Sequence, residues 1–124
     1  MSIDNNHPYS EAVIAGGLVF LSGCLPDEAA APFTDATQLL DAAMTTVERR
    51  LREVGGTLDD LVKLTYFVTD IGLRDAANEQ YIRLWEEPRP TRTLIGVASL
   101  PKNSTVEIDA IARHSESYSQ PLAD

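Results

Sequence analysis

The strongest constraint on the fold is that the strand-like segments are apolar on both of their faces. Successive side chains of a strand point to opposite faces of the sheet. Apolar residues nevertheless occupy neighbouring positions in Leu18 to Leu21, Leu64 to Phe67 and Leu94 to Val97. A sheet with one face in water would instead show a polar residue at every second position. The sequence therefore predicts a sheet that protein covers on both faces.

The chain supplies only two helices to cover that sheet. The predicted order is β-β-α-β-α-β-β, with strands at Ser10 to Ile14, Leu18 to Ser22, Val62 to Thr69, Thr91 to Val97 and Ser104 to Ala112, and helices at Phe33 to Val54 and Leu73 to Trp85. Gly16-Gly17 predicts a hairpin turn, Thr34 a helix cap, and Gly55-Gly56 a helix end. The predicted class is α+β, with both helices on one face of one sheet. Another copy of the chain is the simplest cover for the other face, so a symmetric oligomer is expected.

The length and charge of the chain narrow the functional classes. A chain of 124 residues fits a single domain, with a core at about 8–113 and a polar tail at 114–124. A net charge of −9 opposes binding to nucleic acid or to an anionic membrane. Arg49, Arg50 and Arg52 cluster, but Glu48 and Glu53 flank them, so they are interpreted as a solvated helix face.

The cysteine content and the N-terminus favour the cytoplasm. Cys24 is the single cysteine, so no intramolecular disulfide can form. Met1 to Tyr9 is polar and lacks the basic start and apolar run of a signal peptide. A soluble cytoplasmic protein is therefore expected.

Arg92 is the first candidate for chemistry, because it lies on an apolar strand face with Leu94. An arginine keeps its charge in proteins, so a buried one needs an anion, and its planar fork matches a carboxylate. The spacing alone leaves two interpretations open. Arg92 either binds an acid group, or it lies at a strand end and extends to water.

Glu107 is the second candidate. It shares a face of the last strand with Asp109 and Ile111, opposite an apolar face. A carboxylate beside Arg92 would either pair with the guanidinium or position a water molecule. The alternative is an ordinary exposed polar face.

Three weaker candidates precede the first helix, namely Tyr9, Ser22 and Cys24. Tyr9 and Ser22 can donate hydrogen bonds to a substrate, and Gly23 lets a ligand approach the backbone before Cys24. A lone cysteine such as Cys24 is more often an inert buried residue than a nucleophile. No metal site or cofactor is predicted, because neither histidine has a cysteine or carboxylate at ligand spacing and no phosphate-binding loop is present.

Six segments in a fixed order resemble the RidA/YjgF family of small trimeric imine deaminases. They are PYSEAV (8–13), GGLVFLSG (16–23), VKLTYFVTD (62–70), NEQY (78–81), RPTRT (89–93) and LPKNSTVEIDAIA (100–112). None of these segments is specific alone, but their order and spacing together are. The resemblance covers about Pro8 to Ala112.

The resemblance implies a chorismate-mutase-like fold with one mixed sheet, a homotrimer, and active-site clefts between neighbouring subunits. It implies that Arg92 holds the substrate carboxylate and that Glu107 positions water. Tyr9, Ser22, Gly23 and Cys24 would line the cleft. The implied reaction is metal-free hydrolysis of small enamines or imines, of the 2-aminoacrylate/2-iminopropanoate type, to 2-keto acids and ammonia.

Two departures put the substrate in doubt. A glutamine that usually follows the Ser-Gly pair is Cys24 here, and a cysteine usual two residues after the arginine is Leu94. A dedicated deaminase of a longer enamine, such as an aminomuconate or 3-aminoacrylate, is one alternative. A small-acid binding protein without catalysis is another. Some relatives are described as endoribonucleases, but the acidic charge counts against that activity.

Overall fold

The computed structural model describes residues 7–114 of the chain. Residues 115–124 of the predicted polar tail lie outside the described residues. His114, at the start of that tail, is buried, and its Nε2 lies 3.1 Å from the carbonyl oxygen of Val54. Within residues 7–114, no helix has the length and apolar character needed to cross a membrane.

The observed element order is the predicted one. The strands are β1 (Ala12–Ala15), β2 (Leu18–Cys24), β3 (Leu61–Val68), β4 (Thr91–Gly96) and β5 (Val106–Arg113), and the helices are α1 (Ala36–Glu53) and α2 (Arg74–Leu84). Short 3-10 turns are η1 (Glu28–Ala30), η2 (Leu58–Asp60), η3 (Ile71–Leu73) and η4 (Pro101–Asn103). The predicted strand and helix bounds agree with these to within about three residues.

The five strands form one mixed sheet in the order β1-β2-β5-β3-β4. β3 and β4 are parallel, and every other neighbouring pair is antiparallel. Parallel neighbours need a crossover connection, and α2 provides it between β3 and β4. β4 is the last strand in this order and therefore an edge strand, so Arg92 lies at the border of the sheet.

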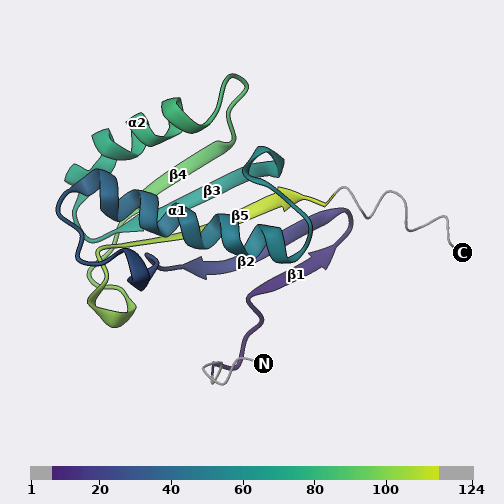
Figure 1. Cartoon of the computed structure of the whole chain (residues 1–124), viewed down its shortest axis with the longest axis horizontal. Coiled ribbons are helices and arrows are strands. Elements are labelled where there is room, and N and C mark those ends of the chain that lie inside the picture. Colours follow the sequence, from purple (N-terminus) through teal and green to yellow (C-terminus); the bar gives the residue numbers. More distant parts are fainter. Residues whose placement is uncertain (1–6, 115–124) are drawn as a thin grey trace, which may run out of the picture.

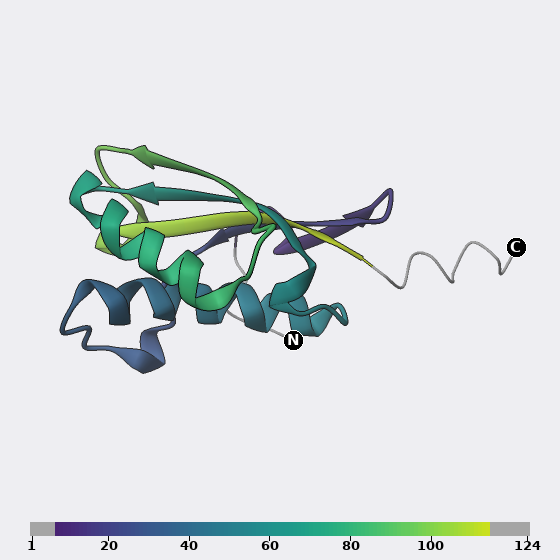
Figure 2. The ribbon, with the colours of Figure 1, turned by 90° about the horizontal axis from the view of Figure 1, so that it is seen from above.

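Both long helices lie on one side of the sheet, and the opposite side carries none (Figures 1 and 2). The core lies between the two layers and includes Leu40, Val47 and Leu64, each fully buried. On the opposite face, Phe20 remains 41% exposed and Ile95 40% exposed. The predicted apolar second face is therefore present, and the described chain leaves it uncovered.

One cap differs from the prediction. Asp35, not Thr34, caps α1, because its side chain accepts a hydrogen bond from the backbone N–H of Gln38. Thr34 instead donates its hydroxyl to the Gln38 side chain at 2.8 Å. The predicted glycine end is confirmed: Gly55 has φ +85°, and the N–H of Gly56 reaches the Leu51 carbonyl at 2.8 Å.

Candidate functional site

Arg92 points to the helix side of the sheet. It pairs with Leu64 of β3, and paired residues on neighbouring strands share a face. Leu64 is fully buried under the helices. The guanidinium therefore extends beneath α2 from an edge strand, and the side chain is half-buried.

Two aromatic rings and one amide surround the Arg92 guanidinium. Its Cζ lies 5.4 Å from the ring centroid of Tyr66 and 5.1 Å from that of Tyr81, within the range of cation–π attraction. Nη2 donates to Oδ1 of Asn78 at 2.7 Å. Nη1 is buried and has no hydrogen-bond partner among residues 7–114. An unsatisfied buried N–H of a permanent cation is costly, and an anionic oxygen would relieve that cost.

Buried hydrogen bonds fix the two tyrosines. The hydroxyl of Tyr66 donates to Oε1 of Gln80 at 2.6 Å, and Nε2 of Gln80 donates to Asp41 at 2.9 Å. The hydroxyl of Tyr81 lies 3.3 Å from the carbonyl oxygen of Thr91. Burial raises the pKa of both phenols, and the opposing effect of Arg92 is smaller. Both rings therefore stay neutral and hold the guanidinium by their faces.

Glu107 extends from the opposite face of the same sheet. Leu64 pairs with Ala110 of β5 as well as with Arg92, so those three side chains share the helix side. Glu107 is three positions from Ala110, and side chains alternate along a strand. Within one chain, Glu107 and Arg92 therefore do not lie side by side.

A cavity of about 670 Å³ brings Glu107 together with predicted site residues. Its wall includes Tyr9, Gly23, Glu107 and, unexpectedly, Arg50. Its size is typical of small-molecule pockets. A Cβ at Gly23 would overlap the Glu107 carboxylate, so the glycine allows the acid to approach the backbone of β2. Three of the predicted site residues, Tyr9, Gly23 and Glu107, thus line one cavity.

The environment of Glu107 makes its carboxyl a weaker acid than usual. Burial raises the pKa of this carboxyl, the neighbouring charge of Asp109 raises it further, and Arg50 acts in the opposite direction. A raised pKa makes the carboxylate a stronger proton acceptor, and the same group can later return the proton. The cavity therefore contains a group suited to proton transfer.

Ser22 and Cys24 use their side chains within the protein. The Ser22 hydroxyl donates to the carbonyl oxygen of Ser10 at 2.5 Å. The Cys24 thiol is fully buried and lies 3.4 Å from the Ser22 carbonyl oxygen. Burial raises the pKa of Cys24 to about 11, so the sulfur is neutral at physiological pH.

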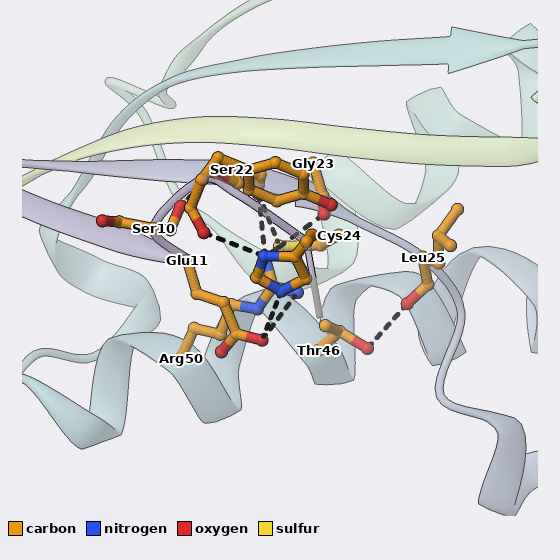
Figure 3. Close-up of polar contacts among 10 residues, drawn as sticks. Ser10, Glu11, Ser22, Gly23, Cys24, Leu25, Thr46 and Arg50 are labelled. Carbon is orange, nitrogen blue, oxygen red and sulfur yellow. Dashed lines mark hydrogen bonds and ion pairs between the residues drawn. The ribbon is translucent and has the colours of Figure 1, made fainter. Parts of the chain in front are cut away.

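Arg50 corrects the interpretation of the basic cluster. Arg49 and Arg52 are solvated, with side chains 51% and 71% exposed, but the Arg50 side chain is only 15% exposed. Its Nη1 donates to the carbonyl oxygens of Ser22 at 3.0 Å and Gly23 at 3.2 Å (Figure 3). Helical spacing could have revealed this, because Arg50 lies three residues after the fully buried Val47.

The residues around Arg92 were also missed. Asn78, Tyr66 and Tyr81 come from α2 and β3, and only Asn78 and Tyr81 share a segment of the sequence. Tyr66 precedes Asn78 by twelve residues and Tyr81 by fifteen, so the three residues give no local pattern. Across residues 7–114, no group of three or more histidine, cysteine or carboxylate side chains is arranged to hold a metal ion.

Comparison with known proteins agrees with this architecture. The family described as Endoribonuclease L-PSP matches residues 1–114. The 2-iminobutanoate/2-iminopropanoate deaminase of Dermatophagoides farinae is 33% identical over 110 residues, which is 84% of each chain. The structure of RidA from Psychrobacter sp. PAMC 21119 has a TM-score of 0.78 at 30% identity, covering 87% of this chain and 89% of that one. Escherichia coli TdcF with bound serine gives a TM-score of 0.76 at 31% identity, covering 86% and 88%. The chain thus belongs to the Endoribonuclease L-PSP family, that of the RidA/YjgF proteins.

Proposed function

We propose that this protein hydrolyses small 2-imino acids and their enamine tautomers to 2-keto acids and ammonia. The observation that carries the proposal is the environment of Arg92. The guanidinium is held between Tyr66 and Tyr81, and Asn78 binds one of its terminal nitrogens. The other terminal nitrogen is buried without a partner among residues 7–114. A substrate carboxylate would match that donor in charge and in its capacity to accept a hydrogen bond.

The relatives support a small amino-acid-like substrate. One is named 2-iminobutanoate/2-iminopropanoate deaminase. Another, TdcF of Escherichia coli, was crystallised with serine, which carries a carboxylate beside an amino-bearing carbon. An imino acid has the same arrangement, with a C=N bond in place of the C–N bond.

In the proposed reaction, Arg92 binds the carboxylate and so fixes the position of the neighbouring imine carbon. Glu107 accepts a proton from water as the oxygen attacks the carbon of the protonated imine, and a neutral tetrahedral aminoalcohol forms. Glu107 then returns that proton to nitrogen, the C–N bond breaks and ammonia leaves, and the hydroxyl proton passes to Glu107 as the C=O bond forms. An enamine first takes a proton on carbon, which converts it to the imine.

We further propose that the active site lies between copies in a homotrimer. Arg92 and Glu107 leave opposite faces of the sheet, so one chain does not present both to one small substrate. The exposed apolar face, which includes Val13, Phe20 and Ile95, would be covered by neighbouring copies. Light scattering should then give a mass of about three times the 13.5 kDa of the chain.

RNA is not the proposed substrate, although the family description names a ribonuclease. A net charge of −9 repels a phosphate backbone. Arg50, the most buried member of the basic cluster, donates to backbone carbonyls rather than projecting into solvent.

The test of the proposal is turnover of freshly generated 2-iminopropanoate, followed as ammonia and keto acid. Wild-type protein should accelerate hydrolysis, and Arg92→Ala should lower kcat/KM by about 100-fold or more, because the charged contact with the substrate carboxylate is lost. Arg74→Ala, an exposed arginine at the start of α2, is the matched control and should stay active. Full activity in Arg92→Ala would refute the role of Arg92. Saturable binding of 2-ketobutyrate without turnover of any imine would instead identify a binding protein.

A further inference from the structure

Arg50, in the last turn of α1, makes an unusual set of contacts for a helical residue. One nitrogen, Nη1, lies within hydrogen-bonding distance of the carbonyl oxygens of both Ser22 and Gly23, and it lies 3.5 Å from the sulfur of Cys24. The other terminal nitrogen lies 3.8 Å from the carboxylate of Glu11. Figure 3 shows this guanidinium lying against the end of β2. The contacts join α1 to three consecutive residues of one strand.

The strand is irregular where Arg50 contacts it. The pairing of β2 with β5 shifts register between Leu21 and Cys24, which marks a bulge. In a regular strand, consecutive carbonyls point to opposite sides. Here those of Ser22 and Gly23 converge on one donor. Their peptide groups are trans, so the N–H groups of Gly23 and Cys24 both point away from Arg50.

The same stretch of β2 contacts the proposed proton-transfer group. The Glu107 carboxylate occupies the space in which a Gly23 Cβ would lie. Gly23 is therefore in contact with Glu107 through its Cα and with Arg50 through its carbonyl oxygen. Arg50 and Glu107 also line the same cavity. Movement of the bulge would change the position of Glu107.

We propose that Arg50 is a positioning residue of the active site. It fixes the Ser22–Cys24 bulge and so keeps Glu107 and the Gly23 backbone in place relative to the substrate. This inference rests on the proposed deaminase function. It assigns Arg50 no contact with the substrate. Its expected contribution is to kcat, because misplacement of a catalytic group by about 1 Å can lower a rate about 100-fold.

The charge of Arg50 gives the role a second signature. Arg50 lowers the pKa of Glu107, whereas burial and Asp109 raise it. The other charged or titratable groups that line the cavity are His7, Tyr9, Glu11, Asp27, Glu28, Arg49 and Lys102. Removal of Arg50 alone should therefore raise the pKa of Glu107. If the Glu107 carboxylate is the active form, the acidic limb of the kcat/KM profile moves to higher pH.

The test compares Arg50→Met, Arg50→Lys and Arg52→Met with the wild type in the imine assay. Arg50→Met should lower kcat by about tenfold or more with little change in KM, and shift the acidic limb upward. Arg50→Lys keeps the charge and should restore the pH profile, but only part of kcat, because the ammonium lacks the planar fork. Arg52 is solvated on the same helix, so Arg52→Met should match the wild type. Wild-type kcat and pH profile in Arg50→Met would overturn the inference.

Backbone NMR separates this inference from the proposed function. The amide resonances of Gly23 and Cys24 should move in Arg50→Met, and in Arg50→Lys if the methionine variant does not fold. The change in these two chemical shifts on addition of 2-ketobutyrate should also be smaller in the variant than in the wild type. Unchanged Gly23 and Cys24 resonances in a folded variant would overturn the positioning role whatever the activity. A wild-type protein without imine turnover would overturn the proposed function, while the amide shifts would still decide whether Arg50 holds the bulge.

Discussion

The regions around Arg92 and around Glu107 are held in place by different means. Arg92 lies on the helix side of an edge strand, where two tyrosine rings and the Asn78 amide hold it in a largely apolar environment. Glu107 lies on the other face, against a glycine and within the electrostatic influence of Arg50 and Asp109. The first region suits binding of a fixed negative charge, and the second suits movement of a proton. Substitutions in the two regions should therefore affect different kinetic constants.

The largest expected effects are those of the two charged groups themselves. Arg92→Lys should raise KM for the imine by about tenfold or more, because a point charge replaces the bidentate fork. Glu107→Gln preserves shape but removes the base, and should lower kcat about 100-fold or more with little change in KM. Steady-state kinetics on both variants checks the contrast. Equal effects on KM and kcat in the two variants would contradict the division of roles.

Gly23→Ala should disturb only the second region. The added Cβ would overlap the Glu107 carboxylate, which must move. Because that carboxylate is the end of a flexible side chain, we expect kcat to fall by about tenfold to 100-fold while the melting temperature changes little. Gly96→Ala is the control, since its Cβ would meet only Ile71 at an ordinary 3.9 Å. Unchanged kcat in Gly23→Ala would show that the contact has no catalytic importance.

Tyr66→Phe should separate stability from function in the first region. The variant loses the hydroxyl that donates to Gln80 at 2.6 Å and leaves that buried amide oxygen unpaired, at a cost of about 1–3 kcal/mol in the free energy of unfolding. The ring beneath Arg92 remains, so KM should change little. Tyr66→Leu, which also removes the ring, should raise KM as well. Denaturant unfolding and kinetics on the pair provide the measurement, and an equal rise of KM in both variants would count against the stacking role.

The smallest expected effect is a shift of the pH profile. Asp109 raises the pKa of Glu107, so Asp109→Asn should lower it. The carboxylate form of Glu107 then persists to lower pH, and the acidic limb of kcat/KM should move down. Arg50→Met should move the same limb up. A shift of both variants in one direction would show that Glu107 does not set this limb.

The strand and helix order was readable from the sequence because it depends on local patterns. Alternation in Ser104 to Ala112 and the three- and four-residue spacing in α1 are properties of neighbouring residues. The apolar face around Phe20 was predictable for the same reason. The Asp35 cap was missed because Thr34 and Asp35 are both good capping residues, and only the hydrogen bonds distinguish them.

The site was only partly predictable, since it depends on contacts between distant segments. Family resemblance pointed to Arg92 and Glu107 as candidates, but their opposite orientations required the sheet register. Tyr66, Gln80 and Asp41 form one hydrogen-bonded network, although 39 residues separate Asp41 from Gln80 in the sequence. No local sequence pattern links those positions, which is why the surroundings of Arg92 were not foreseen.

The central claim is that Arg92 and Glu107 from different copies complete one active site, and a mixing experiment tests it most directly. Arg92→Ala and Glu107→Gln, each inactive alone, are co-expressed with different tags and the mixed oligomers are purified. A shared site predicts recovery of about a quarter of the wild-type activity in a random trimer, because some interfaces regain both residues. Arg92→Ala mixed with the double variant is the control and should stay inactive. Mixed trimers of the two single variants without any recovered activity would contradict the claim.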